Sequence, residues 1–471
     1  MATVARCLGA SLVSAALAQQ VGQLSQEHHI PMSVESCKRA GGCTTEETQI
    51  VMDMQWRWIH NKDAYNNCLP GEFWDKDLCP DPKTCSQNCA MEGVDEKGYT
   101  ENYKALPVEK GIKLEFPNAP RVYMLDGEDK YKMFKLKNKE FTFDVDLSSL
   151  PCGMNAALYF VEMDEHGDRT GLNPGGAKYG AGYCDAQCPH MRYIRGEANL
   201  LDWEQTHSAM NPDGEILTGG HEGRYGYCCA EMDILEANTA AGVYTAHPCS
   251  EEKQAVCEGK EQCGDKGEGF TGYCDKDGCG FSSYRMGDKQ FWGPGQDFTV
   301  DTSKPMTIVT QFVTHDNTDD GDLVDIRRFY LQDGKLFKNS QASVLEGGGD
   351  SLTDSMCNEQ NKAFNQTSNG YKDAGGMKTM GEALGRGEAL GRGMVLSMSI
   401  WDDSFGRMLW LDGEKSRFDE DPNTLGVKRG PCPFKYGTHE DTTEYAKEHG
   451  SMSATFTNVR YGDLDSTYSL I

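Results

Sequence analysis

The sequence lacks any long hydrophobic run beyond its first 18 residues, and no stretch rich in proline, serine and threonine divides it. A membrane-spanning helix needs about 20 consecutive apolar residues, so no membrane association is expected. Without a linker, the rest of the 471 residues are interpreted as one large domain. Histidine is also scarce, with 11 residues scattered along the chain. We therefore expect neither a metal nor a cofactor.

Positive charge is scarce as well. Lysine and arginine total 46 against 73 aspartates and glutamates, which gives a formal net charge of −27. Such a surface repels nucleic acids and anionic membranes, so neither is expected as a partner. An uncharged polymer is compatible with this charge, which by itself says nothing about fold or reaction.

The first 18 residues have the pattern of a secretory signal peptide. Arg6 precedes an apolar run over 8–17, and Ala16-Leu17-Ala18 is a small-residue cleavage pattern before Gln19. We expect residues 1–18 to be removed and the mature protein to be extracellular.

Cysteine usage agrees with export. One of the 19 cysteines, Cys7, lies in the signal peptide, and the other 18 could form nine disulfides. The pairs Cys85/Cys89 and Cys184/Cys188 have spacings that also occur in zinc sites. We favour disulfides because the histidines are scattered and the compartment is oxidising.

Strand-like segments recur from end to end, whereas helical periodicity is rare. Runs that alternate, or are rich in β-branched and aromatic residues, cover 141–147, 157–163, 306–314, 394–400 and 454–460. The connections are rich in glycine, which totals 53, so the chain is predicted to form an all-β sandwich with extended loops. One connection, 381–393, contains Gly-Glu-Ala-Leu-Gly-Arg twice and is interpreted as a surface insertion.

Three carboxylates occur within six residues, in the segment Glu231-Met232-Asp233-Ile234-Leu235-Glu236. On a strand, Glu231 and Asp233 share one face while Met232 and Ile234 point into a core. Glu236 can join the first two only if the strand bulges between Asp233 and Glu236. We therefore predict a β-bulge there.

Two carboxylates about 5–5.5 Å apart across a sugar ring are what retaining glycoside hydrolysis requires, one as nucleophile and the other as acid and then base. The alternative is an ordinary acidic patch on an exposed strand, because acidic residues are abundant in this chain. Like charges on one face repel, and a purely structural strand has no reason to accept that cost. We therefore favour a catalytic role.

Four tryptophans are candidates for sugar binding. Trp56 and Trp58 would lie on one face of a predicted strand about 6–7 Å apart, close to the length of one pyranose unit. Trp401 and Trp410 flank a second acidic pair. Flat aromatic rings stack on the apolar face of a sugar. A single tryptophan is more often a core residue, so this interpretation depends on the group.

Further segments carry a family resemblance: Gln55-Trp56-Arg57-Trp58, Phe143-Asp144-Val145-Asp146, Leu150-Pro151-Cys152-Gly153, Ala157-Leu158-Tyr159-Phe160-Val161, Gly182-Tyr183-Cys184-Asp185-Ala186-Gln187-Cys188-Pro189, His247-Pro248-Cys249 and Trp401-Asp402-Asp403. Together with the carboxylate segment, they resemble glycoside hydrolase family 7, which comprises reducing-end cellobiohydrolases and endoglucanases. The resemblance covers nearly all of the chain after residue 18.

The resemblance implies a single catalytic domain over 19–471, a jelly-roll β-sandwich of two curved antiparallel sheets whose long loops form a substrate tunnel. It makes Glu231 the nucleophile, Glu236 the acid and base, and Asp233 a residue that tunes the nucleophile, with His247 beside the reacting sugar. We expect a nearby anion to raise the pKa of Glu236 and keep it protonated, and hydrogen bonds to keep Glu231 ionised.

The same match assigns substrate-binding residues: Trp58 at the tunnel entrance, Trp56 and Trp401 on the glycone side, Trp410 on the product side, Asn155, Tyr159, Tyr183, Asp185 and Gln187 near the scissile bond, and Arg285 and Arg429 on the leaving cellobiose. A third product-side arginine is missing, with Gly269 near its place and Lys266 the nearest cation. The implied partner of this monomer is a cellulose chain, with cello-oligosaccharides and cellobiose as its fragments.

The resemblance also implies nine disulfides: Cys37–Cys43, Cys68–Cys89, Cys79–Cys85, Cys152–Cys432, Cys184–Cys229, Cys188–Cys228, Cys249–Cys274, Cys257–Cys263 and Cys279–Cys357. No carbohydrate-binding module is expected after the last strand. Asn365 begins a glycosylation sequon.

Loop length separates the two activities of the family, because long loops close a tunnel and short loops leave an open groove. Segments 204–227, 263–274 and 412–432 are long, which favours a cellobiohydrolase that cleaves β-1,4-glucosidic bonds of cellulose from the reducing end. An endoglucanase of the same family is the alternative. A lectin-like glucan-binding protein is less favoured, because it needs neither Glu236 as an acid nor Asp233 beside Glu231.

Overall fold

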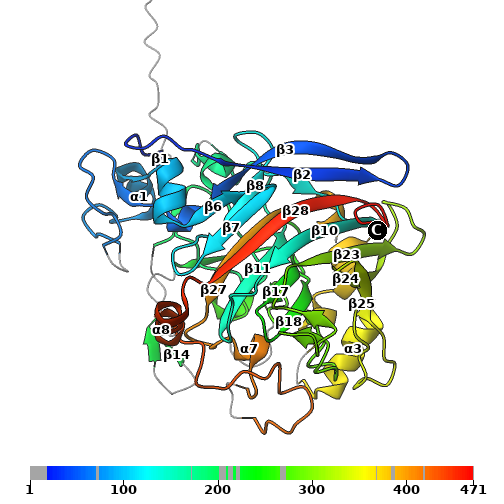
Figure 1. The fold of residues 1–471 in the computed structure, drawn as a ribbon. Coiled ribbons are helices and arrows are strands. Elements are labelled where there is room, and N and C mark those ends of the chain that lie inside the picture. The colour runs from blue at the N-terminus through cyan, green and yellow to red at the C-terminus, as the bar shows by residue number, and fades with distance from the viewer. Residues whose placement is uncertain are drawn as a thin grey trace, which may run out of the picture.

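Long antiparallel strands dominate the computed structural model (Figure 1). It describes residues 19–70, 74–170, 172–200, 208–210, 216–218, 223–265, 272–366, 369–382, 388–416 and 420–469. The predicted signal peptide lies outside these residues, as do Lys266, Gly269 and parts of the three long loops and of 381–393. The chain is mostly β, and its large curved sheets pack as a sandwich, as predicted.

The first layer has the order β24–β23–β10–β28, and β28 continues to β7 and to β2. Its strands are β2 (Ile30–Lys38), β7 (Gly111–Glu115), β10 (Lys139–Asp146), β23 (Met306–Thr314), β24 (Leu323–Gln332) and β28 (Ser453–Asp463). All these pairs are antiparallel except β2 with β28, which is parallel. The central strands of this layer therefore come from both halves of the chain.

The second layer has the order β20–β18–β17–β11–β27–β8. Its strands are β8 (Val122–Leu125), β11 (Met154–Val161), β17 (Glu231–Ala237), β18 (Gly242–His247), β20 (Cys279–Ser282) and β27 (Met394–Asp402). The long strand β3 (Gly42–Met52) pairs with β2 of the first layer and β8 of the second, so it connects the two layers. The five strand segments predicted from the sequence are confirmed within a few residues.

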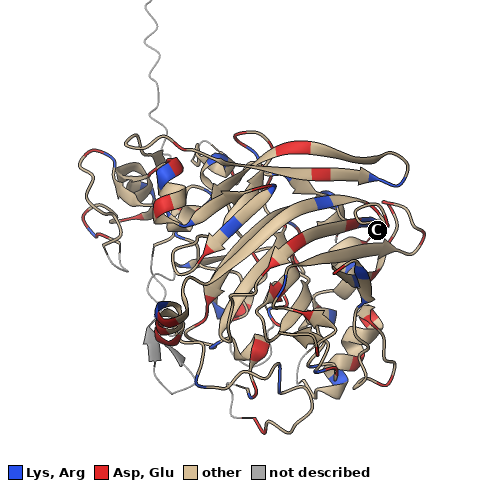
Figure 2. Cartoon of the chain, in the orientation of Figure 1, with Lys and Arg blue, Asp and Glu red and all other residues tan. Residues whose placement is uncertain are grey.

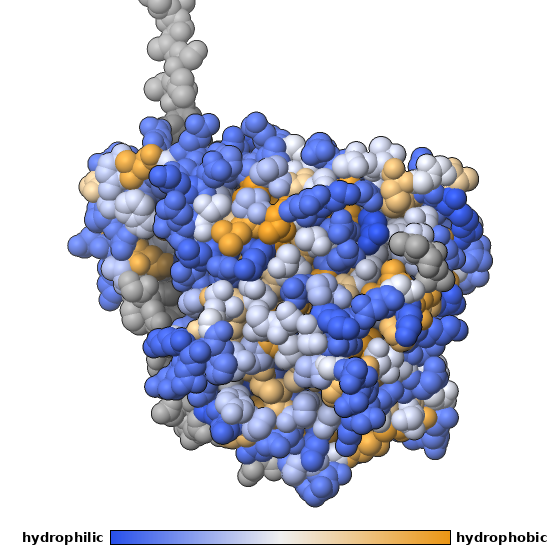
Figure 3. Space-filling view, viewed as in Figure 1, coloured by the Kyte–Doolittle hydropathy of each residue, from blue (hydrophilic) through white to orange (hydrophobic). Residues whose placement is uncertain are grey.

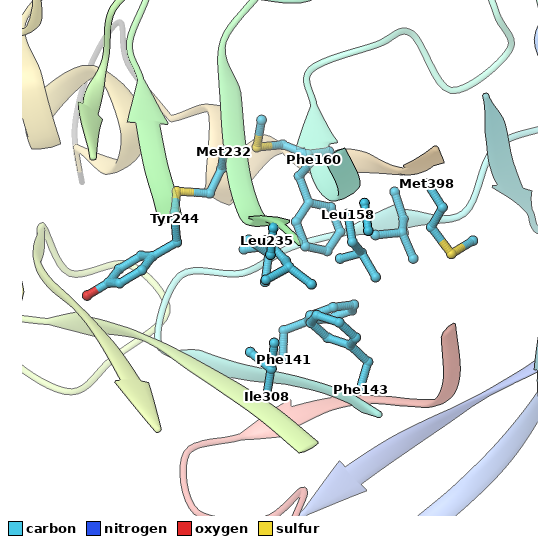
Figure 4. Close-up of a cluster of buried hydrophobic side chains, with 14 of the residues drawn as sticks. Phe141, Phe143, Leu158, Phe160, Met232, Leu235, Tyr244, Ile308 and Met398 are labelled. Carbon is cyan, nitrogen blue, oxygen red and sulfur yellow. The ribbon is translucent and has the colours of Figure 1, made fainter. Parts of the chain in front are cut away.

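The core lies between the two layers. Phe141, Phe143 and Ile308 of the first layer face Leu158, Phe160, Met232, Leu235, Tyr244 and Met398 of the second (Figure 4). All of these side chains are buried. Because strand side chains alternate, each strand of the second layer buries one row here and turns the other row to the opposite face of the sheet.

Short elements connect the layers. The strands are β1 (Gln20–Val21), β4 (Ile59–Asn61), β5 (Cys89–Met91), β6 (Ala105–Val108), β9 (Met133–Phe134), β12 (Tyr193–Ile194), β13 (Glu197–Ala198), β14 (Ser208–Met210), β15 (Ile216–Thr218), β16 (Tyr225–Cys228), β19 (Ala255–Glu258), β21 (Trp292–Gly293), β22 (Val300–Asp301), β25 (Lys335–Lys338) and β26 (Ser351–Leu352). The helices are η1 (Met54–Trp56), α1 (Pro82–Asn88), η2 (Gly98–Asn102), η3 (Gly176–Tyr179), α2 (Gly259–Gln262), α3 (Asp354–Ala363), α4 (Gly370–Asp373), α5 (Gly376–Gly381), α6 (Ala389–Arg392), α7 (Leu409–Asp412) and α8 (His439–His449).

The helices are too short for a clear periodic signal, but side-chain caps mark several of their starts. Thr353 begins α3, and Thr438 forms a capping box with Asp441 at the start of α8. The sequence signal for these helices is therefore their capping residues, because their periodicity is too weak to indicate them.

The nine disulfides are those implied by the family resemblance. The cysteines with zinc-like spacing, Cys85, Cys89, Cys184 and Cys188, are all disulfide-bonded. Their thiolates are therefore not available as metal ligands.

Acidic residues are spread over the face shown in Figure 2 and are dense on α8. Hydrophilic residues cover most of this face in Figure 3, and the hydrophobic ones form small groups. Within the described residues, no helix has the length and hydrophobicity required to cross a membrane.

Candidate active site

A β-bulge in β17 assembles the carboxylates, as predicted. Against β18, Asp233 pairs with Thr245 and Glu236 with Val243, so two residues of β17 oppose the single Tyr244. The extra residue breaks the alternation, and Ile234 and Leu235, 0% and 2% exposed, both enter the core. The side chains of Glu231, Asp233 and Glu236 therefore all point to the opposite face of the sheet.

Each acidic side chain has its own neighbours. The Asn155 side-chain amide donates to Oε1 of Glu236 at 3.0 Å, and the Ala186 backbone N–H donates to Oε2 of Glu231 at 3.0 Å. Asp233 Oδ2 lies 3.0 Å from Nε2 of His247. The four residues predicted to be catalytic are therefore on two adjacent strands, β17 and β18.

Protonation differs across this group. Burial, followed by the charge of Asp233, raises the pKa of Glu236 to about 8. This confirms the predicted direction, although burial is the larger cause. Burial alone would lower the pKa of His247, but the hydrogen bond and charge of Asp233 outweigh it and raise that pKa well above 6.5. Asp233 and His247 thus form an ion pair beside a protonated Glu236.

The prediction that hydrogen bonds keep Glu231 ionised is wrong for this structure. Burial, followed by the charges of Asp233 and Asp185, raises the pKa of Glu231 well above 4.5. The Ala186 N–H is one donor, and it does not offset these effects. Glu231 therefore ionises at a higher pH than an ordinary glutamate.

Two tyrosines lie in the wall of the site near Glu231, and burial, with a smaller contribution from the charge of Glu231, raises the pKa values of Tyr159 and Tyr183. The hydroxyls of Tyr159 and Tyr183 lie 2.9 Å apart, and Tyr183 donates to Oδ2 of Asp185 at 2.5 Å. Burial raises the pKa of Asp185. The exposed Gln187 turns its amide to the carbonyl of Lys276 at 2.8 Å. The backbone N–H of Gln187 donates to Oδ1 of Asp185 at 2.7 Å. Hydrogen bonds therefore link four of the predicted substrate-binding residues, Tyr159, Tyr183, Asp185 and Gln187.

Arg121 completes this wall, and the sequence did not identify it. Its guanidinium carbon lies 3.2 Å from the centre of the Tyr183 ring, and its Nη2 lies 2.6 Å from Oδ2 of Asp53. Arg121 immediately precedes β8, and Asp53 immediately follows β3. Only the pairing of these strands brings the two residues together, so no spacing in the sequence could have indicated them.

The prediction that Trp56 and Trp58 share a strand face is wrong. The Asp53 side chain accepts a hydrogen bond from the Gln55 N–H at 2.7 Å and begins the short helix η1, which ends at Trp56. Trp58 lies just before β4. Both indoles are nevertheless exposed, at 39% and 40%, so both remain available for stacking.

The other two tryptophans lie together. Trp401, on β27, is 36% exposed, and its ring centre lies 6.1 Å from that of Trp410 with 28° between the ring planes. Asn155 pairs with Trp401 in the sheet. Strand β11 therefore lies between Trp401 and the acidic residues of β17.

The two predicted product-side arginines are neighbours. Burial, followed by the charge of Arg429, lowers the pKa of Arg285 well below its usual value. Burial lowers the pKa of Arg429 to about 10. The Nε of Arg285 donates to the Gly426 carbonyl at 2.9 Å, and its guanidinium carbon lies 4.1 Å from the centre of the Phe364 ring. The two guanidinium groups repel each other, and ligand oxygens bound between them would reduce that repulsion.

Comparisons with known proteins identify the family of this chain. The model of glycosyl hydrolase family 7 matches residues 21–468. A GH7 family cellobiohydrolase from Daphnia pulex is 42% identical, with a TM-score of 0.86 over 95% of this chain and 100% of that chain. The Humicola insolens endocellulase EGI is 35% identical, with a TM-score of 0.77 over 96% of this chain and 100% of that chain.

A cellobiohydrolase from Melanocarpus albomyces, solved with cellotetraose, is 32% identical, with a TM-score of 0.82 over 95% of this chain and 99% of that chain. The chain described here belongs to glycosyl hydrolase family 7.

Proposed function

We propose that this protein is a cellulase that hydrolyses β-1,4-glucosidic bonds with retention of configuration and releases cellobiose from the reducing end of the chain. The observation that carries the proposal is the bulge in β17, which puts Glu231, Asp233 and Glu236 on one face beside His247. Similar solved structures include cellobiohydrolases and endocellulases, one of them with cellotetraose and one with cellobiose.

In the first step, Glu236 donates its proton to the glycosidic oxygen while Glu231 attacks the anomeric carbon. The raised pKa of Glu236 keeps this proton in place up to about pH 8. Asn155 orients the carboxyl through the 3.0 Å hydrogen bond to Oε1. In the second step, Glu236 takes a proton from water, which then cleaves the glycosyl–Glu231 ester and restores the original configuration.

Glu231 must be ionised to attack. The active form has Glu231 ionised and Glu236 protonated, and both pKa values are raised, so the rate is expected to increase with pH as the pair loses its first proton and to decrease as it loses its second. The pH profile is therefore bell-shaped, and its two apparent pKa values belong to the coupled pair.

Attack from a chain end is favoured by the aromatic pair Trp401 and Trp410 and by the two arginines, Arg285 and Arg429, which would hold the departing cellobiose. The tunnel itself is a proposal, since parts of the long loops lie outside the described residues. The endoglucanase alternative keeps the support of the Humicola insolens relative.

We further propose a secreted monomer with one catalytic domain over 19–471, and glycosylation at the exposed Asn365.

Product analysis on amorphous cellulose tests the proposal. The wild type should release mainly cellobiose, and NMR should show the β-anomer first. Glu231→Gln and Glu236→Gln should each lower the rate by about 10²–10⁴-fold or more, whereas Glu96→Gln, at an exposed position, should not. A random range of oligosaccharides with a rapid loss of viscosity would favour the endoglucanase, and the α-anomer as first product would refute Glu231 as nucleophile.

A further inference from the structure

A small polar cavity adjoins the turn 275–278, which also contacts His247. Its volume is about 20 Å³, enough for one ion or one water molecule. Its walls are the turn 275–278, helix α3 and the segment 366–371 that leads into α4. The residues that carry the argument are Asp275, Asp277, Gln360, Asn361, Gln366 and Tyr371. The cavity is therefore lined mainly by oxygen-bearing side chains.

Two of these side chains have an oxygen that receives no hydrogen bond from the part of the chain that the structure describes. Asp275 and Gln360 are each 3% exposed, and within the described residues neither Oδ2 of Asp275 nor Oε1 of Gln360 has a hydrogen-bond partner. An unsatisfied buried acceptor costs about 1–3 kcal/mol, and more when it is charged. Both orphan atoms are oxygens, so the missing ligand must be a cation or a hydrogen-bond donor.

The walls are fixed in place. Cys274 and Cys279 bound the turn, and each is in a disulfide: Cys249–Cys274 on one side and Cys279–Cys357 on the other. Cys357 belongs to α3, one turn before Gln360. A frame that is already rigid loses little entropy when it binds a ligand.

We propose that this cavity binds a calcium ion through Oδ2 of Asp275 and Oε1 of Gln360. Asp277, whose charge also acts on Arg285 and Arg429, adds negative charge to the wall. The side-chain amides of Asn361 and Gln366, which are hydrogen-bonded to each other at 3.3 Å, line it as well. Calcium accepts six to eight oxygen ligands in flexible geometry, including carboxylates, amide carbonyls and water. Magnesium requires a stricter octahedron, and zinc prefers nitrogen and sulfur ligands. A water molecule would satisfy the two acceptors but, being neutral, would add nothing to the partial compensation that His247 gives the buried carboxylate charge.

The calcium ion would also hold the catalytic histidine in place. The Asp275 carbonyl lies 2.8 Å from Nδ1 of His247, and a Cβ on Gly278 would lie 2.6 Å from the same nitrogen. The same turn thus contacts the imidazole and lines the cavity. An ion bound to the Asp275 side chain would hold the Asp275 carbonyl in place. That carbonyl in turn keeps the His247 ring oriented for its ion pair with Asp233.

Terbium luminescence tests the proposal without relying on hydrolysis. Terbium replaces calcium at oxygen sites, and Tyr371, which lines the cavity, is positioned to transfer excitation energy to it. We expect one saturable site per chain in the wild type, displaced by calcium with a Kd on the order of 10⁻⁴ M. Asp275→Asn and Gln360→Leu should each weaken it at least tenfold, and Asp373→Asn, exposed on α4, should leave it unchanged.

The absence of any saturable signal up to about 10 mM, well above the range of extracellular calcium sites, would show that the cavity holds only water and would overturn the proposal. Equal binding by all four proteins would do the same, because it would place the ion on the acidic surface. If Asp275→Asn does not fold, Gln360→Leu, which removes no charge and sits on a helix, decides the outcome alone.

Discussion

Replacing Glu236 by glutamine should lower the rate of hydrolysis by about 10²–10⁴-fold or more and yet make the protein more stable at alkaline pH. The carboxyl of Glu236 has its pKa raised from 4.5 to about 8 in the folded state. A group with a raised pKa binds more protons folded than unfolded between these two values. Its stabilising contribution is therefore complete below about pH 4 and is lost as the pH rises through about 8. Glutamine cannot ionise and avoids this loss.

The size of the effect follows from the shift. Each pKa unit corresponds to 1.36 kcal/mol, so 3.5 units give about 5 kcal/mol at most. Glu236 retains some contact with solvent, and we reduce this to about 2–3 kcal/mol for solvent screening. Glu236→Gln should thus gain about 2–3 kcal/mol of unfolding free energy relative to the wild type between pH 4 and pH 8.5.

Urea unfolding of both proteins at pH 4, 5.5, 7 and 8.5, with the disulfides intact, measures this difference. Other buried carboxyls with raised pKa values, such as Asp412 at about 7 and Asp275 at about 6, are present in both proteins and cancel. Glu96→Gln serves as the control for the loss of one carboxylate. Parallel pH curves for wild type and Glu236→Gln would show that Glu236 is not held protonated, and the acid assignment would lose its physical basis.

Three further predictions address other parts of the structure. Asn155→Ala removes the hydrogen bond that lowers the pKa of Glu236, so the alkaline limb of the kcat/KM profile should move to higher pH; an unchanged limb would contradict that role. Leu235→Ala empties a core position that is 2% exposed and should cost about 2–5 kcal/mol of unfolding free energy, and a loss below about 0.5 kcal/mol would mean that the bulge does not bury this side chain. The net charge of −27 should preserve activity in NaCl at seawater strength, and a collapse of turnover there would refute this.

The sequence predicted the elements whose signal is local. The alternation of apolar and polar residues located the strands. Glu231 and Asp233 can share a strand face with Glu236 only if the strand bulges, and β17 contains that bulge. The pairing of the cysteines came from the family resemblance, and all nine bonds are present.

A local helix cap, a contact between distant segments and an effect of burial were not predicted from the sequence. Trp56 and Trp58 leave the expected strand because Asp53 caps a short helix. Arg121 reaches Tyr183 only through the pairing of strands remote in sequence. The ionisation of Glu231 was misjudged because burial, which no spacing of residues reveals, raises its pKa more than its hydrogen bond lowers it.

The position of β28 has a consequence for biosynthesis. This strand, residues 453–463, pairs with β10, β2 and β7 near the middle of its layer. A ribosome makes it after nearly all other strands, so the emerging polypeptide must keep three unpaired strand edges apart until synthesis is almost finished. A premature stop codon before residue 453 would leave a hole in the sheet instead of a shortened enzyme, and quality control in the secretory pathway would be expected to remove the product.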